Sequence, residues 1–127
     1  MQLRNLNYPV VIMRSDGSLM NETYALNHPV ETLLCGPAAS VMGGAYLGHY
    51  PKSVIIDMGG TTSDIALVKD HLPVRADNGI QIGSWRTFVK GLYVDTFGLG
   101  GDSEICYQEN NLFLSDRRVM PLCILAA

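Results

Sequence analysis

Asp57-Met58-Gly59-Gly60-Thr61-Thr62-Ser63-Asp64 is the stretch of this sequence that decides the fold. It ends a β-branched run over residues 53–57 and leads into a second β-type run over residues 63–69. Two such runs joined by a few residues that include two glycines predict a hairpin rather than a strand-to-helix turn. The stretch also contains two carboxylates and three hydroxyls, which makes the predicted turn the first candidate for chemistry.

The composition of this turn is the one that phosphate binding requires. Glycines let backbone N–H groups close on an anion, and hydroxyls add further donors. Asp57 and Asp64 would repel a phosphate unless a divalent cation came between them, so we expect them to serve as Mg²⁺ ligands or to orient a water molecule. The alternative is a tight β-turn with no ligand. A P-loop is excluded because the Walker A lysine is missing, and Ser103 breaks the dinucleotide pattern that begins at Gly98.

A helix is predicted upstream of the hairpin, over residues 37–46. Gly36 and Pro37 fit a helix start, and the apolar positions that follow recur at spacings of three and four. Gly43 and Gly44 leave another side of this helix nearly bare, although each costs about 1 kcal/mol relative to Ala. We expect that side to lie close to another backbone or a ligand; the alternative is a merely weak helix.

Two further hairpins are predicted from turn residues. One joins residues 9–13 to 19–21 around Asp16-Gly17, and the other joins residues 104–107 to 112–114 around Asn110-Asn111. Residues 80–94 contain β-type side chains whose strands and loops cannot be delimited. Trp85 is expected in the core or at an interface with another lobe.

The composition bounds the class of protein. The 127 residues are 47% hydrophobic and 17% charged, which predicts one packed domain. A net charge of −3 and the lack of a basic run argue against a nucleic-acid partner. No apolar run approaches a membrane span, and residues 1–8 lack a secretory pattern. Three cysteines without metal-type spacing indicate free thiols, so a soluble, cytoplasmic protein is expected.

Four motifs, in order, carry a resemblance to a known family. The 57–64 stretch resembles the DxGGTxxD motif of the actin-like ATPase superfamily. Preceded by Cys35-Gly36-Pro37-Ala38-Ala39-Ser40, it is similar to the SGPAA helix and DMGGT hairpin of the hydantoinase/oxoprolinase family. The order continues through Ser84-Trp85-Arg86 to residues 98–103, which resemble the family's GxGGGS segment. The sequence departs from the family at Cys35, where Ser is usual, and at Asp102, where Gly is common and a charge is added beside the expected nucleotide site.

The resemblance, which covers residues 29–103, implies an α/β fold of the ribonuclease-H-like (actin-like ATPase) type. We expect a mixed sheet of about five strands with few helices, built around the 53–68 hairpin. Family members begin with a separate DxGGTxxD hairpin, whereas this chain carries the motif once. Residues 1–127 are therefore expected to form a single partial domain, the core of the second lobe of a hydantoinase A-type ATPase whose N-terminal lobe is missing. The apolar residues 119–127 also favour a chain that continues.

The function implied by the resemblance is part of an ATP-dependent amidohydrolase that acts on a hydantoin or 5-oxoproline ring, with ATP and Mg²⁺ as cofactors. The resemblance makes Asp57 and Asp64 the catalytic residues and metal ligands. It assigns nucleotide contacts to seven residues: Gly36, Gly59, Gly60, Thr61, Thr62, Gly100 and Gly101. Its implied partners are nucleotide, a small cyclic amide, the missing lobe and a second subunit, and the isolated chain is expected to be inactive. The alternatives are a non-catalytic binding or assembly module and a lobe of a sugar or acyl kinase.

Overall fold

The structure, a computed structural model, describes residues 9–120 and residue 124. Its elements up to the central hairpin are β1 (Val11–Met13), β2 (Leu19–Asn21), α1 (Glu22–Asn27), the 3-10 helix η2 (Pro29–Thr32), α2 (Cys35–Gly48), β3 (Lys52–Met58) and β4 (Ser63–Lys69). They are followed by β5 (Leu72–Pro73), β6 (Arg75–Ala76), β7 (Gln81–Ile82), β8 (Trp85–Arg86), β9 (Gly91–Leu92), β10 (Val94–Phe97), β11 (Ser103–Gln108) and β12 (Asn111–Arg118). Predictions for residues 1–8, for Cys123 and for most of residues 119–127 lie outside the described residues.

A four-stranded antiparallel sheet forms the centre of the molecule. Its order is β10-β4-β3, and β5 also pairs with β4. Strands β3 and β4 pair from Lys52 opposite Lys69 to Met58 opposite Ser63, which confirms the predicted hairpin. The α/β class with few helices is also confirmed.

The expectation of one mixed sheet needs correction. All seven strand pairs among the described residues are antiparallel, and four of them form separate two-stranded sheets. Parallel pairing requires a long crossover, usually through a helix, and no helix lies between any two paired strands of residues 9–120. The central sheet therefore has four strands, and all of its strand pairs are antiparallel.

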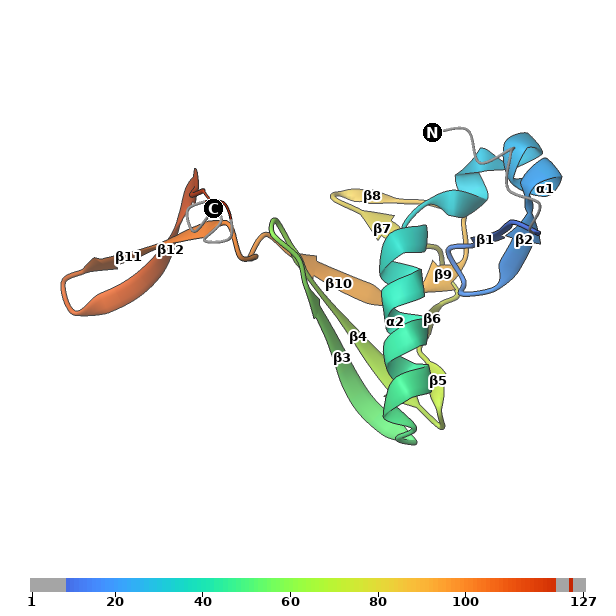
Figure 1. Cartoon of the computed structure of the whole chain (residues 1–127), viewed down its shortest axis with the longest axis horizontal. Helices are drawn as coiled ribbons and strands as arrows, with labels where there is room; N and C mark the ends of the chain where they lie inside the picture. Colours follow the sequence, from blue (N-terminus) through green and yellow to red (C-terminus); the bar gives the residue numbers. More distant parts are fainter. Residues whose placement is uncertain (1–8, 121–123, 125–127) are drawn as a thin grey trace.

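Helix α2 covers one face of the central sheet (Figure 1). Ala38 and Val41 on the helix are buried against Ala66 of β4. A Cβ at Gly44 would lie 3.0 Å from Cγ2 of Ile55 on β3, whereas Gly43 faces open space. One of the two helix glycines thus lies close to a side chain of the sheet, where a backbone or a ligand was predicted. The helix itself starts two residues earlier than expected.

The opposite face of the sheet is apolar, and no described residue covers it. Val54 lies opposite Leu67, and Ile56 lies opposite Ile65. Val54 and Ile56 are 56% and 63% exposed. Successive side chains of a strand point to opposite faces, so Asp57, two residues beyond Ile55, lies on the α2 side of the sheet.

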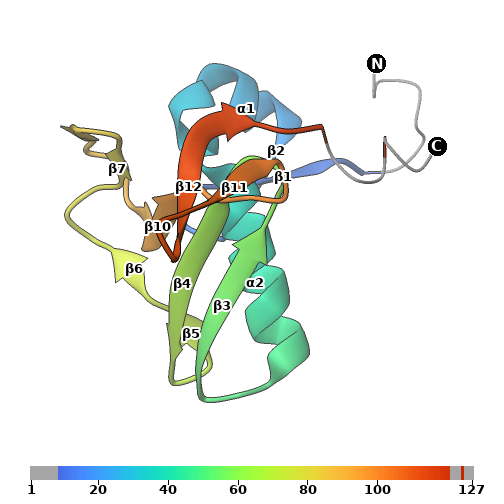
Figure 2. The same cartoon turned by 90° about the vertical axis from the view of Figure 1, so that its left-hand side faces the viewer.

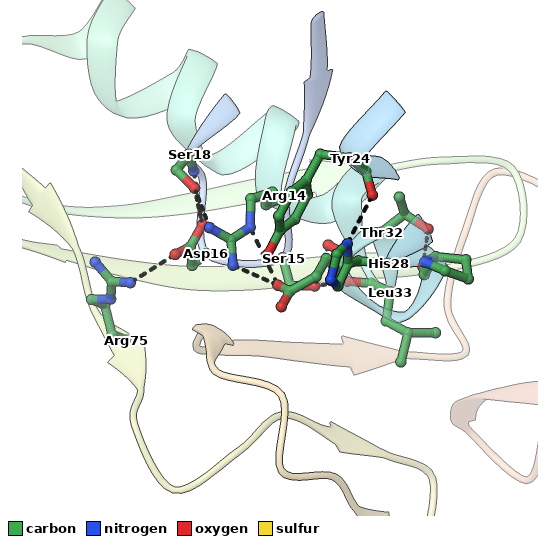
Figure 3. Close-up of polar contacts among 11 residues, drawn as sticks. Arg14, Ser15, Asp16, Ser18, Tyr24, His28, Thr32, Leu33 and Arg75 are labelled. Carbon is green, nitrogen blue, oxygen red and sulfur yellow. Dashed lines mark hydrogen bonds and ion pairs between the residues drawn. The ribbon is translucent and has the colours of Figure 1, made fainter. Parts of the chain in front are cut away.

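A polar network holds the N-terminal hairpin against the segment before α2 (Figure 3). The buried Ser15 donates its hydroxyl to the carbonyl oxygens of Leu33, at 2.6 Å, and of Glu31, at 3.0 Å. Arg14 forms a 2.7 Å ion pair with Glu31. These contacts join the predicted and confirmed β1–β2 hairpin to the chain that enters α2.

The predicted C-terminal hairpin is confirmed and projects from the body as an arm made of β11 and β12 (Figures 1 and 2). Its turn contains Glu109 and Asn110, both with positive φ. Strands β11 and β12 pack mainly on each other, and Tyr107 and Leu112 are exposed. The arm therefore carries apolar side chains that the described residues leave uncovered.

Two simpler predictions concern thiols and membranes. Cys35 and Cys106 are free and partly buried, as expected. In residues 9–120, no helix has the length and apolar character needed to cross a membrane.

Candidate functional site

The turn that joins β3 to β4, residues 59–62, is the centre of the site. The Gly59 N–H donates to the Thr62 carbonyl at 2.9 Å. The N–H groups of Gly60, Thr61 and Thr62 donate to no backbone carbonyl within the described part of the chain. Successive unpaired N–H groups in a turn can bind an anion. The turn thus presents three backbone donors, and the two threonine hydroxyls lie in the same segment.

The loop of residues 98–103 lies directly on the 59–62 turn. The N–H groups of Gly101 and Asp102 donate to the carbonyls of Gly59, at 2.9 Å, and Gly60, at 2.8 Å. A Cβ at Gly100 would lie only 2.7 Å from the Thr61 nitrogen. Glycine at position 100 is therefore required by the close approach of two backbones, and the structure brings together two segments that the sequence singled out separately.

The two predicted carboxylates form a cross-strand row with a hydroxyl. Asp57 on β3 lies opposite Asp64 on β4, which lies opposite Thr96 on β10. The Thr96 hydroxyl donates to Oδ1 of Asp64 at 2.6 Å. Like charges directly opposite each other on neighbouring strands are destabilising, so a cation bound beside Asp57 and Asp64 would relieve a cost built into the sheet.

The donor set fits magnesium bound together with a phosphate. Mg²⁺ is commonly held by one or two carboxylates plus water and substrate phosphate oxygens. Asp57 and Asp64 supply such a pair at the end of the hairpin that carries the turn. Residues 9–120 contain no group of three or more His, Cys, Asp or Glu side chains arranged to hold a metal. A pair of carboxylates leaves the remaining positions around Mg²⁺ to water and phosphate oxygens.

The structure does not bring Gly36 to the turn. Nothing lies within 4 Å of a Cβ built at Gly36, and the start of α2 stands apart from the β3–β4 turn in Figure 1. Trp85 is 79% exposed, so the expected core position is wrong for the described residues. The nucleotide contact of Gly36 and the lobe-interface role of Trp85 stay predictions.

A pocket of about 690 Å³ is lined by residues of β6, β7, β9 and β10, and its volume is within the usual range of small-molecule sites. The residues that line it and matter for its chemistry are Leu34, Asn78, Gln81, Arg86, Asp95 and Thr96. Asp95 accepts a hydrogen bond from the Tyr93 hydroxyl, which raises the pKa of Tyr93. Thr96 thus connects the pocket to Asp64, because Thr96 lines the pocket and its hydroxyl donates to the Asp64 carboxylate.

Sequence reasoning missed this pocket and the role of Thr96. Both depend on strand β10, whose limits the apolar pattern of residues 80–94 does not define. The pairing of Thr96 with Asp64 can be recognised only when the register of β10 on β4 is known. The available signal was a group of three β-favouring residues, Val94, Thr96 and Phe97, just before Gly98, which is weak evidence for a strand.

Comparisons with known proteins bear on the family and the fold of the chain. The family model described as Hydantoinase/oxoprolinase matches residues 1–118. Among solved structures, the chain is similar to acetone carboxylase in a nucleotide-free structure titled "Mechanism of ATP-Dependent Acetone Carboxylation", with a TM-score of 0.71 and 22% identity over 91% of this chain. At that identity the likeness shows a shared fold. The chain spans 16% of the length of that protein. Comparison with curated proteins gives no match.

Proposed function

The chain belongs to the hydantoinase/oxoprolinase family, and on this premise we propose that it supplies the phosphate-binding hairpin of an ATP-dependent enzyme that opens cyclic amides. The observation that carries the proposal is the 59–62 turn, with three backbone donors beside the opposed carboxylates of Asp57 and Asp64. The 98–103 loop supports the turn from one side. A rigid turn of this kind positions an anion without reorganisation when it binds.

Each residue has a separate task in this proposal. The N–H groups of residues 60–62 and the threonine hydroxyls bind phosphate oxygens, and Gly59 closes the turn through its bond to Thr62. Asp57 and Asp64 orient Mg²⁺, which screens the repulsion between carboxylates and phosphate when it is bound. Gly100 and Gly101 hold the turn in place. We also propose that this lobe is ribonuclease-H-like, which the antiparallel β3-β4-β10 sheet with α2 on one face supports.

The pocket beside β10 is the proposed site of the cyclic amide. An amide ring offers one N–H donor and one carbonyl acceptor, and the pocket wall contains both carboxamide and carboxylate side chains, those of Asn78, Gln81 and Asp95. The terminal phosphoryl group of ATP would pass to the amide oxygen as ADP leaves. Water would then break the C–N bond and release phosphate. Thr96 lies between the pocket and Asp64, which supports transfer between these two sites.

The complete reaction is proposed for a longer protein. A second, N-terminal lobe would supply the other wall of the nucleotide cleft, and a second subunit is a further proposed partner. The isolated chain is expected to bind Mg·ATP weakly and not to turn it over. Its cytoplasmic location stays a prediction.

The test is a titration of the chain with Mg·ATP, followed by NMR of the backbone amides of residues 59–62. We expect shifts at millimolar nucleotide that disappear in Asp57→Asn. The matched control is Asp70→Asn, which removes the same charge at the far end of the hairpin, where the positive φ of Asp70 suits Asn equally well. Shifts scattered over the surface, or shifts that persist in Asp57→Asn, would contradict the assignment.

A non-catalytic assembly module is the second candidate function. The observation that favours it is the apolar face of the central sheet that the described residues leave exposed, which includes Val54, Ile56 and Leu67. Apolar patches of this kind commonly mark interaction sites. If the chain shows no specific shift with Mg·ATP, even when the N-terminal lobe is added, this function is favoured. A sugar or acyl kinase lobe would share the nucleotide result and differ only in the acceptor.

A further inference from the structure

Asp102 places a carboxylate directly against the 59–62 turn. A Cβ built at Gly60 would lie 2.8 Å from Oδ2 of Asp102 and 3.2 Å from its Cγ. The backbone N–H of Asp102 also donates to the Gly60 carbonyl at 2.8 Å. Both the main chain and the side chain of Asp102 therefore lie on Gly60.

Three hydrogen bonds fix this position. The Gly101 N–H donates to Gly59 at 2.9 Å, and the Gly100 N–H donates to the Ser103 hydroxyl oxygen at 3.0 Å. The Val119 N–H, beyond the end of the arm, donates to the carbonyl of Asp102 at 2.8 Å. The backbone of Asp102 is thus held by its own loop, by the turn and by the end of β12, which places its side chain beside Gly60.

Among the described residues, no cationic side chain forms an ion pair with Asp102. The ion pairs described for the chain are Arg14 with Glu31, Arg75 with Asp16, and Arg117 with Glu104. None of these pairs, in the part of the chain that the structure describes, includes Asp102. A negative charge therefore lies beside the backbone donors that would receive a phosphate.

We propose that Asp102 is a specificity-determining residue of the turn, whose carboxylate opposes a free phosphate anion and makes the turn select a phosphate that carries a divalent cation. The inference rests on the proposed function of the 59–62 turn and adds the form of ligand that it accepts. Repulsion between two like charges a few ångströms apart at a solvent-exposed surface weakens ligand binding by about five- to tenfold.

Asp102 acts in this proposal through its charge and not as a metal ligand. If Asp57, Asp64 and Asp102 converged on one ion, they would form a three-carboxylate group, and the described residues contain no such group. The two roles predict opposite results when the charge is removed. Loss of a repelling charge strengthens the binding of metal-free nucleotide, whereas loss of a ligand weakens the binding of Mg·ATP.

The experiment compares Asp102→Asn with the unmodified 127-residue chain. Asn keeps the size of the side chain and the backbone bond to Gly60. The amides of residues 59–62 are followed by NMR during titrations with ATP in EDTA and with Mg·ATP. Asp70→Asn is the control for net charge, and Asp102→Ser is a second variant with a smaller side chain. Unchanged amide positions elsewhere in the spectrum show that each variant is folded.

We expect Asp102→Asn and Asp102→Ser to bind ATP in EDTA about five- to tenfold more tightly than the unmodified chain, with a smaller gain for Mg·ATP. The gain should shrink at about 0.5 M salt, because exposed charges are screened. Asp70→Asn should change neither affinity by more than about twofold. If the two Asp102 variants bind ATP in EDTA as tightly as the unmodified chain, or more weakly, the role of Asp102 is overturned. In that case Mg·ATP shifts in the unmodified chain would still support the proposed function. If no protein shows shifts with Mg·ATP, even when the N-terminal lobe is added, both proposals fail.

Discussion

The Thr96 hydroxyl on β10 donates a 2.6 Å hydrogen bond to Oδ1 of Asp64, the residue directly opposite it on β4. Asp57, on the other side of Asp64, belongs to β3, which is an edge strand of the sheet that residues 9–120 form. The two carboxylates of the site therefore differ in their surroundings. Asp64 is oriented by a neutral donor, while Asp57 is the more accessible of the pair.

Thr96→Val should weaken Mg·ATP binding by about three- to tenfold, because the Asp64 carboxylate loses the hydroxyl that orients it. The loss in free energy of unfolding should stay at or below about 1 kcal/mol, since the hydrogen bond is exposed. Thr96→Ser retains the hydroxyl and should behave like the unmodified chain. Nucleotide affinity is measured by NMR titration and stability by urea unfolding. An affinity for Thr96→Val equal to that of Thr96→Ser would remove the orienting role.

Gly100→Ala should destabilise the chain by about 1–3 kcal/mol, because the added methyl group meets the backbone of Gly60 and Thr61. Gly98→Ala, in the same loop, is the matched control, since nothing lies within 4 Å of a Cβ there. Urea unfolding of both variants measures the difference. Equal stabilities would mean that the 98–103 loop does not lie on the turn in solution.

Gly44→Val should lower the free energy of unfolding by about 1–3 kcal/mol, because its Cβ begins 3.0 Å from the Ile55 side chain and forces α2 away from β3. Gly43→Ala should raise it by about 0.5–1 kcal/mol, since that position is open and Ala is the better helix former. Thermal and urea unfolding report both. Effects of the same sign at both positions would contradict the packing of α2 on the sheet.

Stability should fall in acid partly through Asp16. Burial raises the pKa of this carboxyl, but hydrogen bonds from the Ser18 N–H and hydroxyl, with Arg14 and Arg75 nearby, lower it on balance below its ordinary value of 3.8. A carboxyl whose pKa is lower in the folded state stabilises the protein above the unfolded pKa. That contribution is lost as the pH falls through the folded pKa.

Asp16→Asn and Ser18→Ala should both flatten the dependence of unfolding free energy on pH below about pH 4. Asp16→Asn removes the titrating group, and Ser18→Ala removes one of the hydrogen bonds that favour its charged form. Asp70→Asn serves as the comparison. Urea unfolding between pH 7 and acid measures the slope, and an unchanged slope in Asp16→Asn would exclude Asp16 as a source of acid sensitivity.

The hairpins could be predicted from the sequence because turn chemistry is local. Gly17 and Asn110 adopt the positive φ angles that their residue types favour. Helix α1 was not predicted, although Asn21 caps it by accepting from the Tyr24 N–H. Its six residues are too few to show a helical period against the strand that precedes them.

The site could be predicted only in its separate parts. The 59–62 turn and the 98–103 loop each have a recognisable composition, but nothing local says that one lies on the other. The sequence explains Gly60 by the approach of an anion, whereas the structure shows that its missing side chain also makes room for Asp102. Contacts of this kind depend on strand pairing across the whole domain, which a single sequence does not encode in any short window.

Both strands of the β11–β12 arm meet the body at Asp102. This residue precedes β11, and its carbonyl accepts the N–H of Val119, which follows β12. A two-stranded hairpin with little other support opens more readily than the body that carries it, so its amides should exchange with solvent without global unfolding. Because the Asp102 N–H donates to the Gly60 carbonyl, a change in the direction of the arm would act first on the loop that contacts the 59–62 turn.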